Sequence, residues 1–278
     1  MTDGLTVAVT GPTGDIGRAV LRALQESPAV TRVVAMARRP FDPATEGVPK
    51  VEYLQGDILD RAAVNKLVDG ADVVIHLAFL IFGKANEAQE INIQGSRNVF
   101  EATFETEAKR LIYTSSVAAY GFHQDNPIVL TEEVATRGSA DHYYSSQKAA
   151  TEKMLSNLAV GNSTDVYVFR PCIVAGPTAL SLVEEIPYVK MTEMLPERAK
   201  RFVGNLPALR PVVPDPGTPF QLVHEDDVAS ALLAATLGAG EPGAYNLAAD
   251  GKVTVSDVAH ALGWYTNPLP EIAVDAAA

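Results

Sequence analysis

The sequence predicts an α/β fold built on a doubly wound parallel sheet, with a smaller, partly irregular region at its C-terminal side. Three observations indicate this class. Short apolar runs rich in β-branched residues alternate with stretches of helical spacing, a glycine cluster follows the first run, and the alternation continues to about residue 170. Continuous apolar strands separated by helices are typical of a parallel sheet that is covered on both faces.

The elements of this core follow one another in a simple order. Each expected strand is a short apolar run, and each expected helix has apolar residues at helical spacing. The expected strands are residues 5–10, 32–37, 51–55, 72–76, 110–115 and 166–170. The expected helices are residues 18–24 and 61–68, a longer stretch that ends near Ala108, and a stretch that begins at about Tyr143.

The regular alternation of strand-like and helix-like stretches stops after Pro171, so we expect one domain over 1–170 and a second region over 171–278. Prolines are frequent in 187–219 without clear periodicity, which predicts an irregular, mildly basic lid. Residues 220–240 return to the pattern of the core, with a helix from Asp226 to about Leu237. The stretch 245–264 predicts a strand, a turn and a helix that starts near Ser256.

Composition limits the partners of the chain. Of the residues, 47% are hydrophobic and 20% are charged, which suffices for a large core, and the formal net charge is −12. Such a surface would repel nucleic acid and anionic membranes. No apolar run is long enough to span a bilayer, no signal peptide precedes the first strand, and Cys172 has no partner for a disulfide. We expect a cytoplasmic protein with no nucleic acid or membrane partner and no metal site.

A glycine-rich loop, TGPTGDIG over 10–17, joins the first expected strand to the first expected helix. One glycine of such a loop makes the tight turn, another lets the backbone approach a pyrophosphate, and the last lets helix and strand pack closely. The helix N-terminus offers N–H groups to the phosphates. A plain turn is the alternative, but the strand and the helix are both in place, so 1–170 predicts a Rossmann-type dinucleotide-binding domain. Its phosphate loop contains Gly11, Thr13, Gly14, Asp15, Ile16 and Gly17.

The end of the second expected strand indicates which dinucleotide is preferred. NAD-specific sites usually place an acid there to hold the ribose hydroxyls, whereas this chain has Arg38 and Arg39. A guanidinium binds phosphate with a planar fork, so the pair predicts NADP as the preferred cofactor, with NAD as the alternative. Solvated surface arginines are the other interpretation. Asp57 and Ile58 are expected at the adenine, where Asp57 would accept a hydrogen bond, unless it is an ordinary helix-leading aspartate.

Tyr144 and Lys148 lie four residues apart, which places them on one face of the expected helix. The reference pKa of a phenol is about 10, and we expect the nearby ammonium to lower it. Ser116, at the end of the fifth expected strand, would hydrogen-bond to a substrate oxygen, and Ser115 is a less favoured candidate. Tyr143 lacks a lysine at this spacing. The order of glycine loop, strand-end serine, tyrosine and lysine favours a catalytic centre over a surface coincidence.

Together these residues resemble the short-chain dehydrogenase/reductase superfamily, in its extended, epimerase/dehydratase-like branch. The likeness covers nearly the whole chain, and the combination of motifs is specific although each motif alone is not. The motifs are TGPTGDIG at 10–17, GDILD at 56–60, HLA at 76–78, NIQGSRNV at 92–99, TSSVAAYG at 114–121, YSSQK at 144–148, RPCIVAGP at 170–177 and VHEDDVA at 223–229.

The resemblance implies a role for each residue of a four-residue centre. Tyr144 would exchange the proton, Ser116 would orient the reacting oxygen, and Lys148 would tune Tyr144 and hold the nicotinamide ribose. Asn92 would support a water relay behind Lys148. Relatives often pair through the helices after the fourth and fifth strands, so a homodimer is implied, although the residues leave the oligomeric state open. Further contacts with the dinucleotide are implied for Leu77, Ala78, Pro171, Ile173 and Val174, near Cys172, which we interpret as core packing.

Three departures from the patterns of this branch indicate the reaction. The stretch 117–119 replaces the Asp-Glu pair of sugar-nucleotide dehydratases, so the acid–base pair for water elimination is missing. Phe220 stands where sugar-nucleotide epimerases tend to carry an Arg that grips the diphosphate. These epimerases also tend to carry an Asn after the sixth strand, where this chain reads Arg170, Pro171 and Cys172.

The predicted function is an NAD(P)-dependent oxidoreductase that transfers hydride to or from a ketone or alcohol carbon of a small-molecule substrate, bound mainly by 171–278. A sugar-nucleotide epimerase with bound NAD is the alternative. A non-enzymatic dinucleotide-binding sensor is a second alternative, which has no need of a tuned phenol. We expect the substrate not to be a nucleotide sugar, because Phe220 and the stretch Phe79, Leu80 and Phe82 offer apolar walls, unless the stretch packs under the following helix. Four lid residues are either substitutes for the missing Arg or a solvated surface: Arg198, Lys200, Arg201 and Arg210.

Overall fold

The structure is a computed structural model that describes residues 4–81, 85–179 and 211–269. The chain forms two compact units. The larger unit consists of residues 1–178 and 223–247, and the smaller unit consists of residues 179–222 and 248–278.

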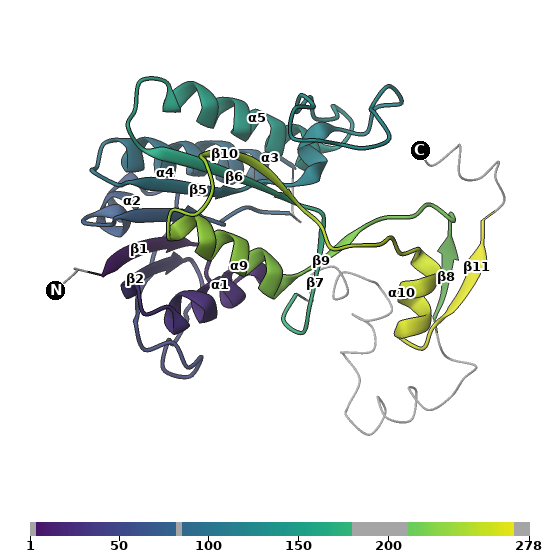
Figure 1. Cartoon of the computed structure of the whole chain (residues 1–278), viewed down its shortest axis with the longest axis horizontal. Coiled ribbons are helices and arrows are strands. Elements are labelled where there is room, and N and C mark those ends of the chain that lie inside the picture. Colours follow the sequence, from purple (N-terminus) through teal and green to yellow (C-terminus); the bar gives the residue numbers. More distant parts are fainter. Residues whose placement is uncertain (1–3, 82–84, 180–210, 270–278) are drawn as a thin grey trace. The chain divides into compact units, whose positions relative to one another are not determined.

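The larger unit is built on a seven-stranded parallel sheet (Figure 1). Along the sheet the order of strands is β10-β6-β5-β4-β1-β2-β3, so the direction of winding reverses between β1 and β4. This order and this reversal define a Rossmann sheet, and ligands of such sheets bind at the carboxyl ends of the strands where the winding reverses. The predicted fold class is confirmed. The strands are β1 (Leu5–Thr10), β2 (Val30–Ala37), β3 (Val51–Gln55), β4 (Val73–His76), β5 (Arg110–Thr114), β6 (Asp165–Pro171) and β10 (Gly243–Leu247).

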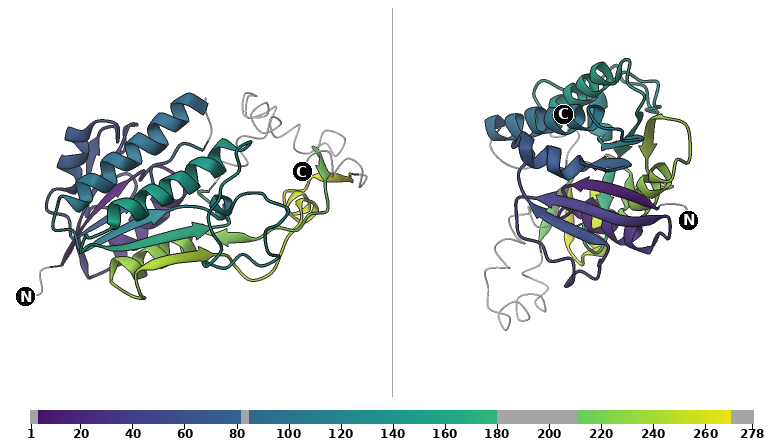
Figure 2. Two further views of the ribbon diagram at one scale, coloured as in Figure 1. Left: turned by 90° about the horizontal axis from the view of Figure 1, so that it is seen from above. Right: turned by 90° about the vertical axis from the view of Figure 1, so that its left-hand side faces the viewer.

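Helices cover both faces of this sheet (Figure 2). Because side chains alternate along a strand, Val7 and Val9 of β1 enter one hydrophobic cluster and Ala8 enters the other. The first cluster packs under α1 (Asp15–Glu26) and α9 (Glu225–Thr236). The second cluster packs under α2 (Arg61–Val68), α4 (Ser96–Phe104) and α5 (Tyr143–Ala159).

The helix expected to end near Ala108 has a different construction. It consists of α3 (Ala85–Gln89), a π-helical segment η1 (Glu90–Gly95) and α4, which ends at Phe104. The Thr106 hydroxyl donates to the carbonyl of Thr103 at 2.7 Å, which satisfies a free carbonyl of the last turn and ends the helix early. The first helix likewise begins at Asp15, three residues before the periodic stretch that predicted it.

The smaller unit contains a parallel pair of strands, β8 (Val212–Asp215) and β11 (Tyr265–Pro268), and helix α10 (Val255–Ala261). A capping box between Thr254 and Asp257 starts α10. Neither strand was expected, and most of the predicted lid lies outside the described residues, including Arg198, Lys200, Arg201 and Arg210. Two further short strands, β7 (Ile173–Ala175) and β9 (Leu222–His224), pair with each other.

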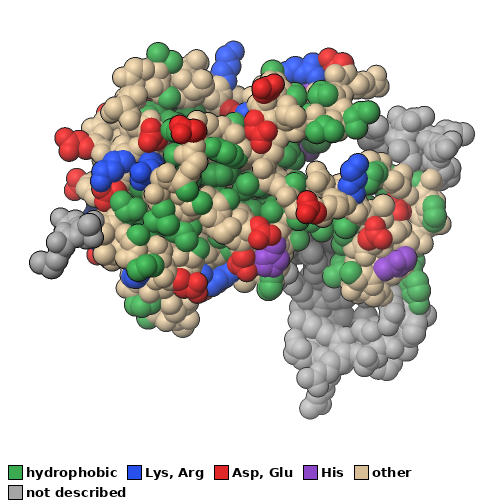
Figure 3. Space-filling view, viewed as in Figure 1, with side chains coloured by type: hydrophobic (Ala, Val, Ile, Leu, Met, Phe, Trp, Pro, Cys, Tyr) green, Lys and Arg blue, Asp and Glu red, His purple; other side chains and the backbone are tan. Residues whose placement is uncertain are grey.

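The surface carries more acid than base. On the face seen in Figure 3, Lys and Arg side chains are interspersed with Asp and Glu and form no continuous basic area. Among the described residues, no helix combines the length and the apolar composition needed to cross a bilayer.

Candidate active site

The glycine loop joins β1 to α1 and owes its shape to two glycines. Gly11 has a φ of +71°, and a Cβ there would lie 2.7 Å from the amide nitrogen of Ala78. A Cβ on Gly17 would lie 2.3 Å from the carbonyl oxygen of Gly11. Gly14 is different, because a Cβ there would meet only the Gly11 carbonyl at 3.6 Å. The loop therefore packs tightly at both ends and is open in the middle.

The open position of the loop lies at the start of α1. Gly14 is the N-cap residue of this helix and supplies no side chain to the first amide groups. Uncapped amides and the positive end of the helix dipole suit a phosphate group. The nearby predicted residues Thr13, Asp15 and Ile16 are all half-buried, and Ile16 packs against the core. The loop thus fits the pyrophosphate of a dinucleotide.

The end of β4 lies beside this loop because Thr10 of β1 is in register with His76 of β4. The Thr10 hydroxyl oxygen accepts hydrogen bonds from the amides of Leu77 and Ala78, each at 3.2 Å. It also contacts His76 Nδ1 at 2.7 Å, and because both lone pairs are engaged, its proton is donated to Nδ1. The other ring nitrogen then donates to Ser96 Oγ at 2.9 Å. Leu77 and Ala78, both predicted to contact the dinucleotide, are therefore fixed next to Gly11.

His76 had no role in the sequence analysis beyond its place in the HLA motif. It is fully buried, and burial together with the charge of Lys148 lowers its pKa to about 3. The imidazole is therefore neutral at physiological pH and serves as a hydrogen-bonded link between β1, β4 and α4.

The two predicted phosphate-binding arginines follow β2 and are exposed. The carbonyl of Arg38 accepts from Gln55 Nε2 at 2.9 Å, and the carbonyl of Arg39 accepts from the Tyr53 hydroxyl. These bonds fix the backbone of the loop against β3. Within the described part of the chain neither guanidinium has an ion-pair partner, whereas the neighbouring Arg18 is paired with Glu46 at 2.6 Å.

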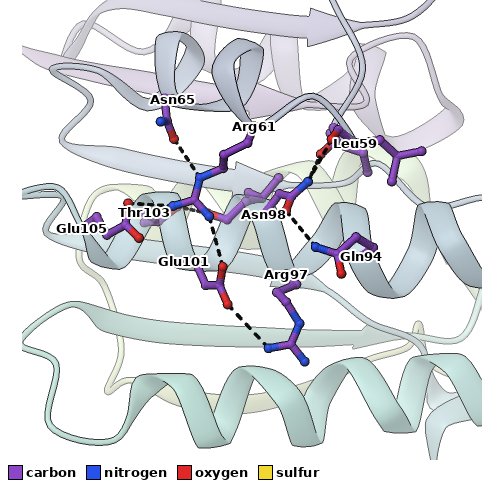
Figure 4. Close-up of polar contacts among 11 residues, drawn as sticks. Leu59, Arg61, Asn65, Gln94, Arg97, Asn98, Glu101, Thr103 and Glu105 are labelled. Carbon is purple, nitrogen blue, oxygen red and sulfur yellow. Dashed lines mark hydrogen bonds and ion pairs between the residues drawn. The ribbon is translucent and has the colours of Figure 1, made fainter.

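The predicted adenine site lies in the loop that follows β3. Asp57 Oδ1 accepts from the amide of Leu59 at 3.0 Å, so the carboxylate already shapes the turn. The Ile58 side chain is buried against Gly95, where a Cβ would approach within 2.5 Å. Asn98 of α4 donates to the carbonyls of Ile58 and Leu59 at 2.9 and 3.2 Å (Figure 4).

Arg61 reinforces the same region by linking α2 to α4. Its guanidinium contacts Glu101 at 3.1 Å and Glu105 at 2.6 Å, and its Nε donates to Asn65 at 2.9 Å (Figure 4). The loop that carries Asp57 is therefore held on a rigid pair of helices.

The Ser116 hydroxyl lies near enough to Tyr144 to lower the pKa of the phenol. Ser116 follows β5 and caps the 3₁₀ turn η2 (Val117–Tyr120), where its hydroxyl accepts from the amide of Ala118 at 3.1 Å. Tyr144 lies in the first turn of α5. The structure therefore brings the predicted serine and tyrosine together.

The pKa of Tyr144 is shifted in the direction opposite to the one expected from the sequence. Burial raises this pKa above its ordinary value of 10, and the nearby Ser116 hydroxyl offsets only part of the rise. The nearby ammonium was expected to lower it, but Lys148 Nζ lies 5.7 Å from the centroid of the Tyr144 ring. Burial also lowers the pKa of Lys148 itself to about 7, so its charge near neutral pH is incomplete. The phenol is accordingly protonated at neutral pH.

Asn92 is buried in the π-helical segment η1, and its role in a water relay behind Lys148 stays a prediction. Its Oδ1 accepts from the amide of Leu80 at 2.7 Å. Its Nδ2 donates to the carbonyl of Leu80 at 2.9 Å and to Gln147 Oε1 at 2.7 Å. Asn92 thus contacts the neighbour of Lys148 on α5 and not Lys148, since Gln147 is the residue whose side chain faces η1. The side chain fixes the loop after β4 to α5.

The predicted nicotinamide wall follows β6. Pro171 is buried, Val174 is half-buried, and Ile173 is 40% exposed. The amide of Cys172 donates to the carbonyl of Leu247 at 2.9 Å. The side chain of Cys172 packs against the core, and burial raises the pKa of its thiol, which disfavours the reactive thiolate.

Aromatic side chains surround Tyr144. Phe79 meets it edge-to-face with ring centroids 5.7 Å apart, and His142 lies at 6.5 Å. Phe122, which is 67% exposed, packs on His142 at 5.2 Å. The Tyr143 hydroxyl donates to the carbonyl of Ile81. We call the five side chains of Phe79, Ile81, Phe122, His142 and Tyr143 the aromatic collar; Phe82, also expected here, lies outside the described residues.

The fold and the loop geometry define a Rossmann-type dinucleotide-binding protein. The model of the NAD dependent epimerase/dehydratase family matches residues 7–248. The chain therefore belongs to this family, and the resemblance to the extended short-chain dehydrogenases/reductases is confirmed. The cofactor class predicted from the glycine loop, NAD(P), agrees with this membership.

Similar curated proteins include steroid-converting enzymes. A 3 beta-hydroxysteroid dehydrogenase/Delta 5→4-isomerase of Monkeypox virus is 32% identical over 170 residues, which is 58% of this chain and 49% of that protein. The 3 beta-hydroxysteroid dehydrogenase type 7 of Homo sapiens is 38% identical over 125 residues, 42% of this chain and 34% of that protein. The chain spans about half the length of the first of these relatives and about a third of the second.

Similar solved structures include sugar-nucleotide epimerases, at a level of identity that shows the fold alone. The UDP-N-acetylglucosamine 4-epimerase of Methanobrevibacter ruminantium is 22% identical with a TM-score of 0.76, covering 98% of this chain and 86% of that one. The UDP-glucuronic acid 4-epimerase of Bacillus cereus, solved with NAD, is 18% identical with a TM-score of 0.75, covering 95% and 86%. The predicted class, an NAD(P)-dependent enzyme of the extended type, is the class of these relatives.

Proposed function

We propose that this chain is an NADP-preferring oxidoreductase that interconverts a ketone and an alcohol, with Tyr144 as the proton donor and acceptor. One observation carries the proposal. Ser116 lies near Tyr144, the buried Lys148 has its Nζ 5.7 Å from the centroid of the Tyr144 ring, and β5, which leads to Ser116, ends at the same edge of the sheet as the glycine loop. A sensor would have no use for such a centre.

The protonation states favour reduction at neutral pH. When bound, the nicotinamide supplies or accepts the hydride. Burial keeps the Tyr144 phenol protonated, so it is ready to donate to the oxygen of a carbonyl substrate as negative charge develops there. Ser116 hydrogen-bonds to the same oxygen and orients it. Lys148, close to Tyr144, stabilises the phenolate that remains after the transfer. Oxidation of an alcohol follows the same path in reverse.

The preference for NADP rests on Arg38 and Arg39. Both guanidiniums are exposed and, among the described residues, free of carboxylate partners, while their backbone is fixed by β3. A charged group on a fixed backbone without a competing partner is well suited to a 2′-phosphate. We assign the main contact to Arg38, which comes first after the strand.

The aromatic collar supports an apolar substrate. A diphosphate needs several desolvated, charge-assisted bonds, ideally from Arg, whereas the collar offers ring faces and an aliphatic side chain next to Tyr144. The steroid dehydrogenases among the relatives are named for alcohols of this apolar kind. We therefore place the substrate among hydrophobic cyclic ketones and alcohols, and we assign the region 171–278, apart from 220–240, mainly to binding the rest of it.

The alternative is an epimerase with bound NAD, which the epimerase-like fold favours. Cofactor turnover distinguishes the two functions. The purified chain is incubated with NADPH or NADH and a panel of hydrophobic cyclic ketones, and in parallel with UDP- and dTDP-sugars. Stoichiometric loss of NADPH with a ketone supports the oxidoreductase. Conversion of a nucleotide sugar with no net change in cofactor overturns it in favour of the epimerase.

The oligomeric state stays a prediction. A homodimer would pair through the outer faces of α4 and α5. Light scattering coupled to gel filtration measures the mass directly, and a monomer at micromolar concentration would contradict the prediction.

A further inference from the structure

Lys148 is a buried cation in an unusual setting. Its side chain is 3% exposed, and its Nζ donates to the carbonyl of Thr114 at 2.8 Å. The same nitrogen lies 3.6 Å from the centroid of the Phe79 ring. This distance is well inside the range of a cation–π contact, which is strongest where water is excluded.

Charged and titratable groups lie near Lys148 on three elements of the larger unit. They are Tyr144 and Glu152 on α5, Tyr113 on β5 and His76 on β4, and Glu152 is itself paired with Arg170 on β6.

None of these groups is a dedicated counter-ion for the ammonium. Glu152 is the only carboxylate among them, and both of its oxygens are bound to Arg170, at 3.1 and 2.7 Å. His76 is neutral because its pKa is about 3, and Tyr144 is protonated because burial raises its pKa. The nearest partners of Nζ recorded for the described part of the chain are the carbonyl oxygen of Thr114 and the face of Phe79, and the Tyr113 ring is more distant, at 5.0 Å.

The Phe79 ring is presented by a backbone that is fixed on both sides. The amide of the preceding residue, Ala78, donates to Thr10 Oγ1. The amide and the carbonyl of the following residue, Leu80, are both bound by Asn92. The ring also touches Tyr144 edge-on at an interplanar angle of 89°. A side chain held in this way cannot leave Lys148 without breaking part of the network.

We propose that Phe79 is a positioning residue for Lys148: its ring face stabilises the charged form of the amine between the Thr114 carbonyl and Tyr144. This inference rests on the proposed function for its importance to turnover, but the contact itself is independent of substrate. The inference also assigns a structural role to Asn92, which fixes the segment that carries the ring. Burial alone would favour neutral lysine, and the ring opposes that tendency without adding a negative charge that would disfavour phenolate.

Fluorination of the ring tests the proposal without changing its shape. Phenylalanine at position 79 is replaced by its mono-, di- and trifluoro analogues through amber suppression, which weakens the negative face of the ring stepwise. The pKa of Lys148 is measured by NMR on protein labelled with ¹³C at lysine Cε, and Lys148→Arg assigns the signal. We expect the pKa to fall at each step, by about one unit in total, given the usual strength of a desolvated cation–π contact.

The same substitutions at Phe100 are the matched control. Phe100 is fully buried and packs edge-on against Tyr113 at 5.5 Å, so it reports general effects of a fluorinated ring in the same core. A pKa of Lys148 that stays constant along the Phe79 series, or that falls equally in the Phe100 series, overturns the proposal. Because this readout needs no turnover, its failure is distinguishable from failure of the proposed function, which the cofactor-turnover assay tests.

Discussion

Asn92 and Gln147 are joined by a side-chain hydrogen bond of 2.7 Å that links the π-helical segment η1 to α5 one residue before Lys148. The bond is buried, and Asn92 makes two more to the backbone of Leu80. Asn92→Ala would leave three polar groups unpaired, and each buried unpaired group costs about 1–3 kcal/mol. We expect a free energy of unfolding that is lower by at least about 2 kcal/mol, measured by urea denaturation. Gln147→Ala breaks one bond only and should cost less; an equal cost would contradict the assigned network.

Tyr144→Phe tests the chemistry. The variant lacks the proton that is transferred, and general acid–base catalysis is typically worth about 10²–10⁴ in rate. We expect kcat to fall by this factor, while the dissociation constant for NADPH, measured by fluorescence, stays near that of the wild type. Lys148→Ala should both slow turnover and weaken dinucleotide binding, because it loses two roles. Wild-type rates for Tyr144→Phe would show that the centre lies elsewhere.

Arg38→Ala tests the choice of cofactor. A charge-assisted hydrogen bond contributes about 1.5–3 kcal/mol, so affinity for NADPH should fall at least about tenfold. Affinity for NADH should change little, because NADH lacks the 2′-phosphate. Arg39→Ala is the control for the general loss of a positive charge and should have the smaller effect. If the wild type binds both dinucleotides equally, the preference is refuted.

His76 predicts part of the response to acid. Its pKa is about 3 in the folded chain, because burial and Lys148 disfavour the charged ring, against an ordinary value of 6.5. Between these values the unfolded chain binds more protons, so stability is fully present above pH 6.5 and is lost as the pH falls towards 3. In His76→Gln the free energy of unfolding should depend less steeply on pH in this window. The exposed His260 offers a control, and an unchanged slope in His76→Gln would exclude His76 as the cause.

Arg170 and Glu152 form a buried ion pair that fastens β6 to α5, and each side chain is 8% exposed. Arg170→Met leaves the carboxylate buried without a partner, which typically costs about 3–5 kcal/mol. The exposed pair of Arg137 and Asp125 is the comparison, because surface pairs are worth about 0–1 kcal/mol. In thermal unfolding, Arg170→Met should therefore lower the melting temperature strongly, whereas Arg137→Met should leave it almost unchanged. Similar changes in both would mean that the pair does not behave as a buried one.

The strands of the sheet were predicted well because each one is a short apolar run that can be recognised without knowledge of the rest of the fold. The stretch 5–10 is a short, mostly apolar run rich in β-branched residues between a polar start and a glycine loop, and it became β1 with the same bounds. The strands β7, β8, β9 and β11 were not predicted, because β7 and β9 have only three residues, and β8 and β11 contain Pro214 and Pro268, which disfavour a strand. The helix of Asn92 was predicted in outline, but its π-helical turn depends on tertiary packing around Gly95.

The candidate site was predictable only as far as its residues follow a motif. The spacing of Tyr144 and Lys148 is a property of one helix, and the structure places Ser116 near enough to Tyr144 to lower the pKa of the phenol. The contact of Phe79 with Lys148 joins segments far apart in the chain, so no local sequence pattern predicts it. The pKa of Tyr144 was expected to fall because sequence spacing shows the neighbouring charge and does not show burial.

The three glycines of the first loop are constrained for different reasons. A side chain at Gly11 or Gly17 would collide with the backbone, so any descendant of this sequence that still folds has to keep them. Gly14 has an ordinary φ of −83° and open space at its Cβ, so folding alone permits alanine or serine there. Only a phosphate group against α1 would forbid the change. Among relatives of this chain, a side chain at this one position would therefore mark the lineages that kept the fold and abandoned the dinucleotide.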